Sequence, residues 1–206
     1  MLPRAWLRRI FPRYIWSLSN RPEVCLTFDD GPHPAATPVV LDFLKIHGMK
    51  ALFFCVGAHV KKHPELYERI LEEGHSVGNH TFNHEHGWKT SCSKYVQSVA
   101  ETKEFVDSVL FRPPYGKITG SCAQKIRAAG YAIVMWSWLS YDYDPKMTHK
   151  QFQKQLRKIR NGDILVFHDN EKTAGRIEQY LAQTVMYLQE KNIKIVPFSH
   201  HESTSK

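Results

Sequence analysis

The hydrophobic and polar positions along the chain alternate between short apolar runs and longer amphipathic segments. Apolar, β-branched or aromatic runs of strand length occur at 23–28, 51–56, 75–77, 110–112, 131–136, 163–167 and 193–198. Segments with helical spacing lie between them, at 37–48, 64–74, 93–109, 119–129, 148–160 and 173–191. Strands that are joined by helical crossovers pair in parallel, since a short hairpin connects only antiparallel neighbours. The pattern therefore predicts an α/β fold with a parallel sheet of seven strands.

Helix start signals and an uninterrupted alternation of strands and helices predict a single domain. Thr37 and Pro38 are expected as the cap and the first residue of one helix. No repeat, linker or low-complexity segment interrupts the alternation. We therefore expect a single domain at 23–198, preceded by a basic and aromatic arm at 1–22 and followed by a polar tail at 199–206.

The composition is that of an ordinary globular protein with an excess of positive charge. The chain has 206 residues, 42% of them hydrophobic and 23% charged, and its formal net charge is +8. Such a charge favours an anionic partner, which could be nucleic acid, a membrane surface or an acidic cell-wall polymer. Much of it lies at 146–160, where Phe152, Leu156 and Ile159 form one helical stripe, so we interpret the basic residues there as a solvated helix face. Nucleic acid is not expected as a partner, because the sequence contains no motif that binds it.

The first twenty residues and the four cysteines indicate in which cellular compartment the protein is expected. Residues 1–20 lack an uninterrupted apolar core and a small-residue cleavage site, and no apolar run is long enough to span a bilayer. A cytoplasmic protein is therefore expected, with the cell envelope as the alternative. The four cysteines form no C-x-x-C pair and are interpreted as reduced thiols, with one incidental disulfide as the alternative. The arm is expected to pack on the domain; the alternative is weak contact with a membrane surface through Trp6, Leu7, Ile10, Phe11 and Trp16.

Side chains that can do chemistry follow the ends of the predicted strands. Asp29 and Asp30 come directly after the first strand. Others follow or end the third, fourth, fifth and sixth strands: His80, His84, Arg112, Asp142 and His168. Parallel α/β folds bind their ligands beyond the carboxyl ends of the strands. The sequence therefore places these side chains on one rim of the fold, which makes that rim the candidate active site.

Asp30, His80 and His84 form a candidate set of metal ligands on this rim. They offer one carboxylate and two imidazoles, and the histidines, four residues apart, bring their rings to one side of a helical turn. With 12 histidines in the chain this spacing alone is weak, and solvated surface imidazoles are the competing interpretation. The Asp pair on the same rim favours the metal, and His86 is a less favoured substitute ligand. Zinc is the first expectation, although cobalt, nickel, manganese and iron also accept such ligands.

A metal would give the adjacent carboxylates of Asp29 and Asp30 separate functions. Adjacent acidic side chains repel each other, and alternation along a strand sends them to opposite sides. A metal site needs an anionic ligand, and the water beside the metal needs a base that is not a ligand. We therefore expect one carboxylate at the metal and the other at the water.

Four motifs resemble those of the polysaccharide deacetylase family, whose members share the NodB homology domain. They are TFDDGP at 27–32, HTFNH at 80–84, RPPYG at 112–116 and ILVFH at 164–168, in the order that the family has them. The resemblance implies a distorted (β/α) barrel of about seven parallel strands in a single domain. It also implies a metal-dependent carbohydrate deacetylase.

The resemblance further implies a role for each motif residue. The metal ligands are Asp30, His80 and His84. The catalytic set is Asp29 as general base, His168 as general acid, Arg112 and Asp142 as the respective partners of these two, and the backbone N–H of Tyr115 at the oxyanion. The implied substrate-binding residues are Leu165 and Tyr143 in the acetyl pocket, with Pro113 and Pro114 in the adjacent loop.

The chain departs from the family at Tyr143, where Trp is usual after the Asp that is Asp142 here. Its smaller ring and its hydroxyl bear on the size of the acyl group and on substrate fit, and leave the chemistry of the site unchanged. Trp136 and Trp138 alternate on a predicted strand, so core packing and a sugar platform are equally expected for them.

The implied reaction removes acetyl groups from N-acetylated sugars, as in peptidoglycan or chitin-like oligosaccharides. Water activated by the metal and by Asp29 attacks the carbonyl, and His168 protonates the leaving nitrogen. One alternative is an O-acetyl xylan esterase or small-amide hydrolase with the same site, and another is a non-catalytic glycan-binding relic. The joint presence of base, ligands and acid argues against the relic. The sequence gives no indication of oligomeric state.

Overall fold

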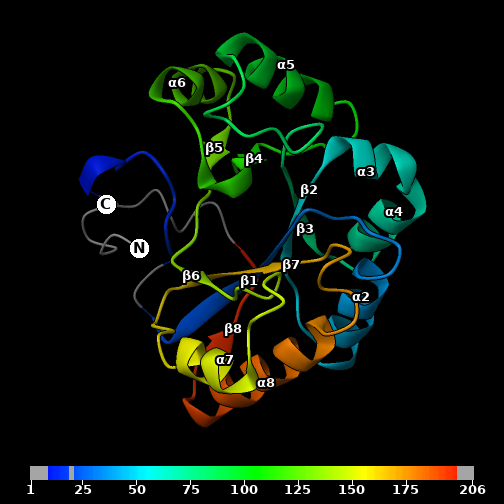
Figure 1. Ribbon diagram of the computed structural model, residues 1–206, viewed down its shortest axis with the longest axis vertical. Helices are drawn as coiled ribbons and strands as arrows, with labels where there is room; N and C mark the ends of the chain where they lie inside the picture. The colour runs from blue at the N-terminus through cyan, green and yellow to red at the C-terminus, as the bar shows by residue number, and fades with distance from the viewer. Residues whose placement is uncertain (1–8, 19–20, 199–206) are drawn as a thin grey trace.

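Short parallel strands form one curved sheet in the interior of the molecule (Figure 1). The structure is a computed structural model that describes residues 9–18 and 21–198. In spatial order the strands are β5 (Ala132–Ile133), β4 (Leu110–Phe111), β3 (Ser76–Asn79), β2 (Leu52–Cys55), β1 (Glu23–Asp29), β7 (Ile164–His168) and β6 (Trp138–Leu139). A further strand, β8 (Lys194–Ile195), pairs with β1 outside this path. The predicted α/β fold, a distorted (β/α) barrel with about seven parallel strands in a single domain, is confirmed.

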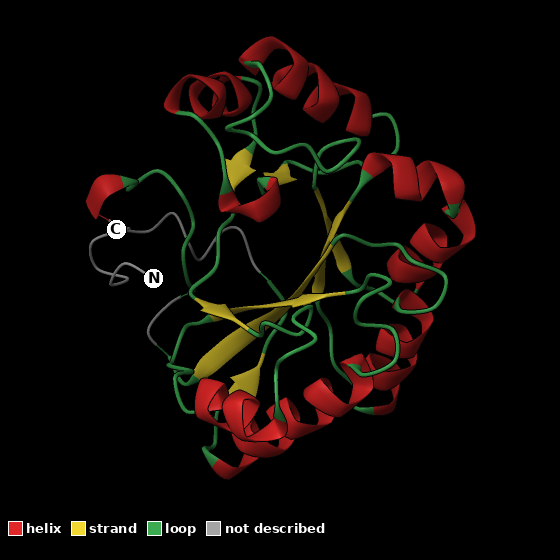
Figure 2. Ribbon diagram, in the orientation of Figure 1, coloured by secondary structure: helices red, strands yellow, loops and turns green. Residues whose placement is uncertain are grey.

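Helices cover the sheet along the top, the right and the bottom of the view in Figure 2. They are α2 (Thr37–Ile46), α3 (Gly57–Lys62), α4 (Pro64–Glu72), α5 (Cys92–Thr102), α6 (Gly120–Ala128), α7 (His149–Leu156) and α8 (Ile177–Glu190), with a 3₁₀ turn at Pro114–Gly116. On α7, Phe152 and Leu156 are fully buried, as the predicted stripe requires. The basic residues of this helix therefore lie on its outer side.

Strand β1 is the centre of the sheet. It pairs in parallel with β2 and β7, and its first residues Glu23 and Val24 pair with β8. Residues Val24 to Phe28 are completely buried, which agrees with the continuous apolar run that a parallel strand covered on both faces requires. The register places Asp29 beside His168 of β7, so two predicted active-site residues lie at the ends of neighbouring strands.

Several predicted element boundaries were wrong. The strand expected at 131–136 is shorter: β5 covers only Ala132–Ile133. A separate strand, β6, begins at Trp138. Helix α3 was not predicted, and α5 ends at Thr102 rather than 109. Thr37 is not a helix cap, because its hydroxyl donates to Asp169 Oδ2 at 2.6 Å and accepts from the backbone N–H of His33 at 2.7 Å. A tertiary contact thus replaces the predicted local one.

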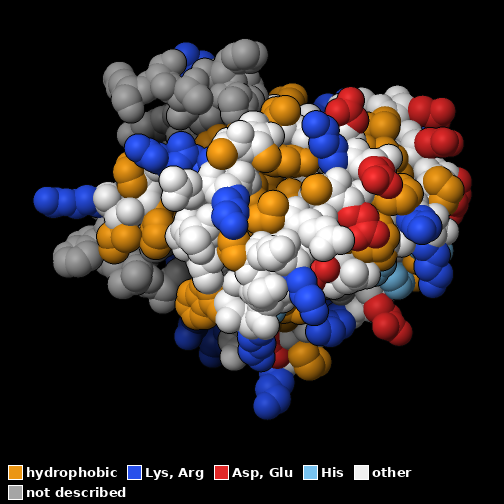
Figure 3. Space-filling model, turned by 90° about the horizontal axis from the view of Figure 1, so that it is seen from above, with side chains coloured by type: hydrophobic (Ala, Val, Ile, Leu, Met, Phe, Trp, Pro, Cys, Tyr) orange, Lys and Arg blue, Asp and Glu red, His pale blue; other side chains and the backbone are white. Residues whose placement is uncertain are grey.

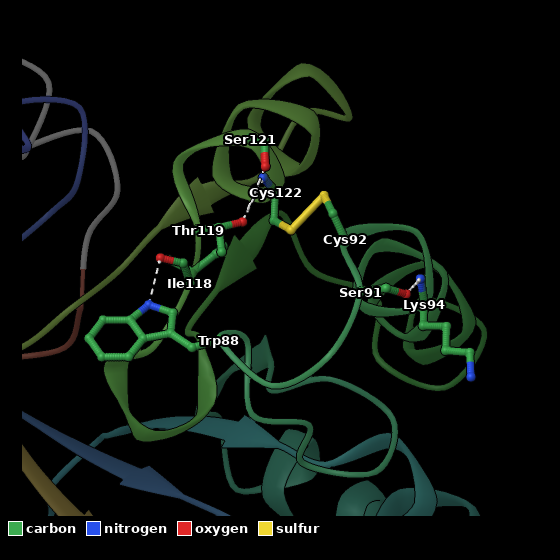
Figure 4. Close-up of a disulfide and its surroundings, with 8 residues drawn as sticks. All are labelled: Trp88, Ser91, Cys92, Lys94, Ile118, Thr119, Ser121 and Cys122. Atoms are coloured by element: carbon green, nitrogen blue, oxygen red, sulfur yellow. Dashed lines mark hydrogen bonds between the residues drawn. A yellow bond between two sulfur atoms is a disulfide. The ribbon is translucent and has the colours of Figure 1, made fainter.

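Cys92 and Cys122 form a disulfide that joins the start of α5 to the start of α6 (Figure 4). Their Cα atoms lie 5.3 Å apart although 30 positions separate them in the chain. The interpretation of all four cysteines as reduced was therefore wrong for this pair, since only the packing of the two helices brings the residues together. Cys25 and Cys55 are free and buried.

The described part of the arm contacts the domain. Ile15 forms a bridge with Val134, and Ser17 forms one with Asp163. Tyr14 and Trp16 pack against the apolar cluster beneath α5 and α6. The residues Trp6 and Leu7, and the tail at 199–206, lie outside the described residues.

The basic charge is not gathered on the face shown in Figure 3. Lys and Arg side chains are scattered there among neutral and apolar ones, whereas Asp and Glu side chains gather toward one end. Among the described helices, none has the length and apolar character needed to cross a membrane.

Gly78 provides a test of the packing between β2 and β3. A Cβ atom at this position would meet the ring of Phe54 at 2.5 Å, and Phe54 is fully buried. We expect Gly78→Ala to lower the free energy of unfolding by about 1–3 kcal/mol, because a packed core does not accommodate an added methyl group. Urea denaturation measures the change. Gly120→Ala is the matched control, since a Cβ there meets nothing within 4 Å; an equal loss in both variants would contradict the packing argument.

Candidate active site

A cavity of about 410 Å³ opens at the carboxyl ends of the strands. Its lining comes from segments that are far apart in the sequence: Asp29, Asp30, His80, His84, Tyr115, Trp136, Leu139, Tyr143, Val166, His168, Asn170 and Lys172. The candidate residues of the rim therefore meet around one cavity. Arg112 and Asp142 lie behind its wall, where both are completely buried.

The backbone at Asp30 explains how two adjacent carboxylates face the same cavity. Asp29 is the last residue of β1, and Asp30 has a φ of 84°, in the left-handed region that non-glycine residues rarely adopt. This turn reverses the alternation that an extended strand would impose. Asp29 and Asp30 consequently both line the cavity.

Arg112 forms a buried ion pair with Asp29. Its Nη1 atom donates to Asp29 Oδ1 at 2.7 Å and to Thr27 Oγ1 at 2.7 Å. Its Nε and Nη2 atoms donate to the carbonyls of Val134 and Met135 at 3.2 and 3.0 Å. The guanidinium also lies over the ring of Phe54, with 4.0 Å between its central carbon and the ring centroid. One oxygen of Asp29 is thus fixed by charge and hydrogen bonding.

Asp30, His80 and His84 form a compact group of potential metal ligands. The Nε2 atoms of His80 and His84 lie 3.6 and 3.0 Å from Asp30 Oδ1, and all three ligand atoms lie within 4.8 Å of one another. Ligands held at about 2.1 Å from a tetrahedral ion lie about 3.4 Å from each other. The observed separations bracket that spacing, so the residues present fit a divalent ion. Burial would raise the pKa of Asp30, but hydrogen bonds from His80 and His84 hold it well below its usual value.

The second nitrogen of each histidine is occupied. His80 Nδ1 hydrogen-bonds the carbonyl of Arg112 at 2.8 Å, and His84 Nδ1 hydrogen-bonds the hydroxyl of Tyr115 at 3.1 Å. Hydrogen bonds to Nδ1 fix the ring orientation and leave Nε2 to the metal, as in many metal sites. His86 is not part of the group: its ring stacks on Tyr115, with 5.2 Å between the ring centroids.

His168 and Asp142 form a second ion pair at the cavity. His168 Nδ1 lies 2.7 Å from Asp142 Oδ1, and the backbone N–H of His168 donates to Asp142 Oδ2 at 2.8 Å. Burial alone would lower the pKa of His168, but Asp142, with smaller contributions from Asp30 and Asp29, raises it to about 9. An imidazole in this position keeps its proton at neutral pH and can donate it.

Two residues that follow His168 were missed as parts of the site. Asn170 Nδ2 donates to Asp30 Oδ2 at 2.7 Å, so it holds the oxygen that does not face the histidines. Asp169 accepts from the backbone N–H of Gly31 at 3.1 Å, and a Cβ on Gly31 would collide with its carboxylate. Burial raises the pKa of Asp169 to about 8. The only signal in the sequence was their place at the end of β7, because neither contact is local.

Backbone strain is concentrated around the cavity. Apart from glycine, the described residues with positive φ are Asp30, Thr81, His84, Tyr115, Tyr141 and Asn192. Three of these line the cavity, and two more are next in sequence to His80 and Asp142. Strained residues persist where the surrounding structure fixes them, and they are common at functional sites. The cluster is independent of any motif and indicates the same site.

The expected substrate-binding residues are only partly at the cavity. Tyr143 lines it, and its ring meets the ring of His168 edge-on at 4.9 Å. Leu165 does not: it is fully buried in the main core, because alternation along β7 turns Val166 and His168 to the cavity and Leu165 away from it. Pro113 and Pro114 are buried and do not line the cavity either.

Further apolar lining comes from the segment that contains β6. Trp136 and Leu139 reach the cavity beside Val166. Trp138, in contrast, is buried in the core, and its Nε1 donates to the carbonyl of Gln155 at 2.9 Å. Core packing is thus confirmed for Trp138. Trp136 lines the cavity and also packs against the core, and its use as a sugar platform stays a prediction.

A parallel α/β barrel that carries a candidate metal-ligand triad, a fixed carboxylate and a paired histidine on its rim has the groups that metal-assisted hydrolysis requires. The family model for polysaccharide deacetylases matches residues 18–134 of the 206 residues. The chain belongs to this family, and the predicted class of enzyme, a carbohydrate deacetylase, is confirmed.

Three known proteins show the extent of the similarity. A peptidoglycan-N-acetylglucosamine deacetylase of Bacillus cereus is 32% identical over 192 residues, which cover 89% of this chain and 90% of that protein. A chitooligosaccharide deacetylase of Azorhizobium caulinodans is 28% identical over 157 residues, 73% of this chain and 75% of that protein. The crystal structure of the Bc1960 peptidoglycan N-acetylglucosamine deacetylase superposes with a TM-score of 0.87 at 28% identity, covering 100% of this chain and 99% of that one.

The buried ion pair of Arg112 and Asp29 gives a prediction for stability. Arg112→Met leaves the Asp29 carboxylate buried without its cation, and we expect a loss of about 3–5 kcal/mol in the free energy of unfolding. Adding Asp29→Asn removes the unpaired charge and should recover part of that loss. Denaturant titration of the single and double variants measures both effects.

The matched control is Arg69→Met. Arg69 pairs with Asp42 and Glu73 nearer the surface, where a pair contributes about 1 kcal/mol or less. If Arg112→Met and Asp29→Asn destabilise the protein additively, the two side chains do not act as a pair.

Proposed function

We propose that this protein removes acetyl groups from N-acetylated glycans of the peptidoglycan or chitooligosaccharide type and that it needs a divalent metal ion to do so. The observation that carries this proposal is the meeting of three groups around one cavity: the ligand set at Asp30, the carboxylate of Asp29 and the histidine His168. The names of the relatives support the choice of substrate class.

Asp30, His80 and His84 would hold the ion. A divalent ion bound there would polarise the acetyl carbonyl and lower the pKa of water, and the imidazole ligands make zinc the first candidate. Asn170 and the partners of the two Nδ1 atoms keep these ligands oriented. Cobalt, nickel, manganese and iron accept the same ligands.

Asp29 acts as the general base. Arg112 holds its Oδ1 atom, which leaves Oδ2 to accept the proton of the attacking water. The backbone N–H of Tyr115 donates to the oxyanion that develops, and one such donor is worth about 3 kcal/mol in the transition state. The left-handed turn at Tyr115, with a φ of 58°, orients this N–H.

His168 acts as the general acid. An amide nitrogen must be protonated before it can leave, because an amide anion is a very poor leaving group. Asp142 keeps the proton on His168 at neutral pH by raising its pKa to about 9. The cavity wall of Trp136, Leu139 and Val166 receives the acetyl methyl group, and Tyr143 closes it beside His168.

We propose separately that the protein works in the cell envelope, and the disulfide supports this location. The sequence alone favoured the cytoplasm, with the cell envelope as the alternative. The cytosol keeps thiols reduced, so the disulfide of Cys92 and Cys122 supports the alternative. An envelope location also agrees with a substrate of the peptidoglycan type.

Acetate release tests the proposed function. The purified protein would be incubated with N-acetylglucosamine oligomers, peptidoglycan fragments and acetylated xylan, after chelation and again after zinc or cobalt is added back. We expect the metal to restore release, and Asp29→Asn to lower kcat about 10²- to 10⁴-fold because the base is lost. Asp42→Asn, which changes an exposed carboxylate, is the control.

The outcomes separate the parts of the proposal. Release from xylan alone would make the protein an esterase. Stoichiometric metal binding that Asp30→Asn abolishes, without release from any substrate, would support the ligand set and contradict the substrate class. Release that persists after complete removal of metal would overturn the metal dependence.

His168→Ala tests the role of the acid. The nitrogen of an amide needs protonation, whereas the oxygen of an acetyl ester leaves far more readily without it. We therefore expect the variant to lose about 10²- to 10⁴-fold in N-deacetylation and clearly less in O-deacetylation. The measurement compares kcat on matched N-acetyl and O-acetyl substrates, and equal losses on both would contradict the assignment.

A further inference from the structure

A second hollow adjoins the active-site cavity. Its volume is about 590 Å³, and its lining is Tyr143, Asp144, Pro145, Lys172 and Arg176. Tyr143 and Lys172 line both hollows, so the two are continuous along these side chains. A glycan whose acetylated sugar lies at His168 would place a neighbouring sugar here.

The hollow combines apolar surface with positive charge. Tyr143 is half-buried and Pro145 is exposed, and aromatic and proline faces pack well against the C–H face of a sugar ring. The ring of Tyr143 is positioned by its edge-on contact with His168. The hollow thus has a surface that suits a sugar as well as groups that suit an anion.

Lys172 and Arg176 have no ion-pair partner within the described ranges, whereas Arg69 pairs with two carboxylates. The Nε atom of Arg176 is buried and, in the same ranges, has no hydrogen-bond acceptor. A buried donor without an acceptor is costly and calls for an explanation. A carboxylate in the hollow would give the two cations, Lys172 and Arg176, an ion-pair partner, and guanidinium groups bind carboxylates with well-matched geometry.

Asp144 is the one acidic side chain of this lining. Its Oδ1 atom accepts from the backbone N–H of Lys146 at 2.9 Å, so part of its charge is used locally. Two cations face one carboxylate, and the hollow retains an excess of positive charge. The arrangement therefore favours an anionic group over a neutral one.

We propose that this hollow binds a carboxylate carried by the sugar next to the one that is deacetylated, so that the enzyme prefers acidic glycans to neutral ones. The carboxylate could belong to a lactyl ether on that sugar or to a peptide attached to it. The proposal rests on the proposed function and makes it more specific, because peptidoglycan carries such groups and chitin-like oligomers do not.

The test uses three glycans with the same sugar backbone that differ in the groups on their lactyl ethers. One tetrasaccharide alternates N-acetylglucosamine with lactyl-ether sugars whose carboxylates are free; a second has these carboxylates converted to carboxamides; a third bears peptides on them. The measured quantity is the ratio of kcat/KM on an acidic glycan to kcat/KM on the carboxamide. A preference for the first substrate assigns the carboxylate to the lactyl group, and a preference for the third alone assigns it to the peptide.

We expect Lys172→Gln and Arg176→Gln each to lower this ratio about three- to tenfold, chiefly through KM, since one charged contact is lost. Asp144→Asn should raise the ratio, because it removes the opposing charge and keeps an oxygen for the Lys146 N–H. Added salt should lower the ratio, because it screens the attraction between the cations and the carboxylate. The matched control is Lys150→Gln, an exposed cation on α7, which should leave the ratio unchanged.

A ratio near one in the unaltered protein, or a ratio that neither Lys172→Gln nor Arg176→Gln changes, would overturn the proposal. If neither these tetrasaccharides nor N-acetylglucosamine oligomers release acetate, the proposed function fails, and binding of the same tetrasaccharides to the protein still tests the hollow. Tighter binding of an acidic glycan that Arg176→Gln abolishes would then support it. Equal binding of the acidic and carboxamide forms would contradict it.

Discussion

The ion pair between Arg112 and Asp29 links the core of this protein to its chemistry. Burying two charges is costly, and here the cost is offset by the pair itself and by three acceptors from two different segments: Thr27 on β1, and the adjacent residues Val134 and Met135. The same contacts fix one oxygen of Asp29, the proposed base. The position of Asp29 is therefore set by the packing of the sheet, and the remaining active-site groups are arranged around it.

Much of the active site could be predicted because it follows from topology. Parallel strands point their carboxyl ends to one rim, so Asp30, His80 and His168 had to lie near one another once the strands were recognised. Motif resemblance then added roles that position alone does not give, such as that of Asp142. The fold class followed from the regular spacing of apolar runs for the same reason.

The remaining features depend on tertiary contacts that leave little trace in sequence. The pairing of Cys92 with Cys122 needs α5 and α6 side by side, and Asn170 meets Asp30 from 140 positions away. The error at Leu165 has another cause. Side chains along a strand point alternately to its two faces, so a prediction that is off by one residue assigns a core side chain to the cavity. Leu165 lies in the core, and its neighbour Val166 lines the cavity.

The central position of β1 has a consequence for how the protein is made. β1 pairs with β2, the next strand in the sequence, but its other neighbours β7 and β8 are the last two strands of the sheet, so these two pairings wait until β7 and β8 have been made. Contacts so distant in sequence slow folding and leave one side of an apolar strand unpaired during synthesis. His168 on β7 and Asp29 on β1, the proposed acid and base, therefore come together only after β7 has been made, and a chain that ends before β7 lacks the complete candidate site.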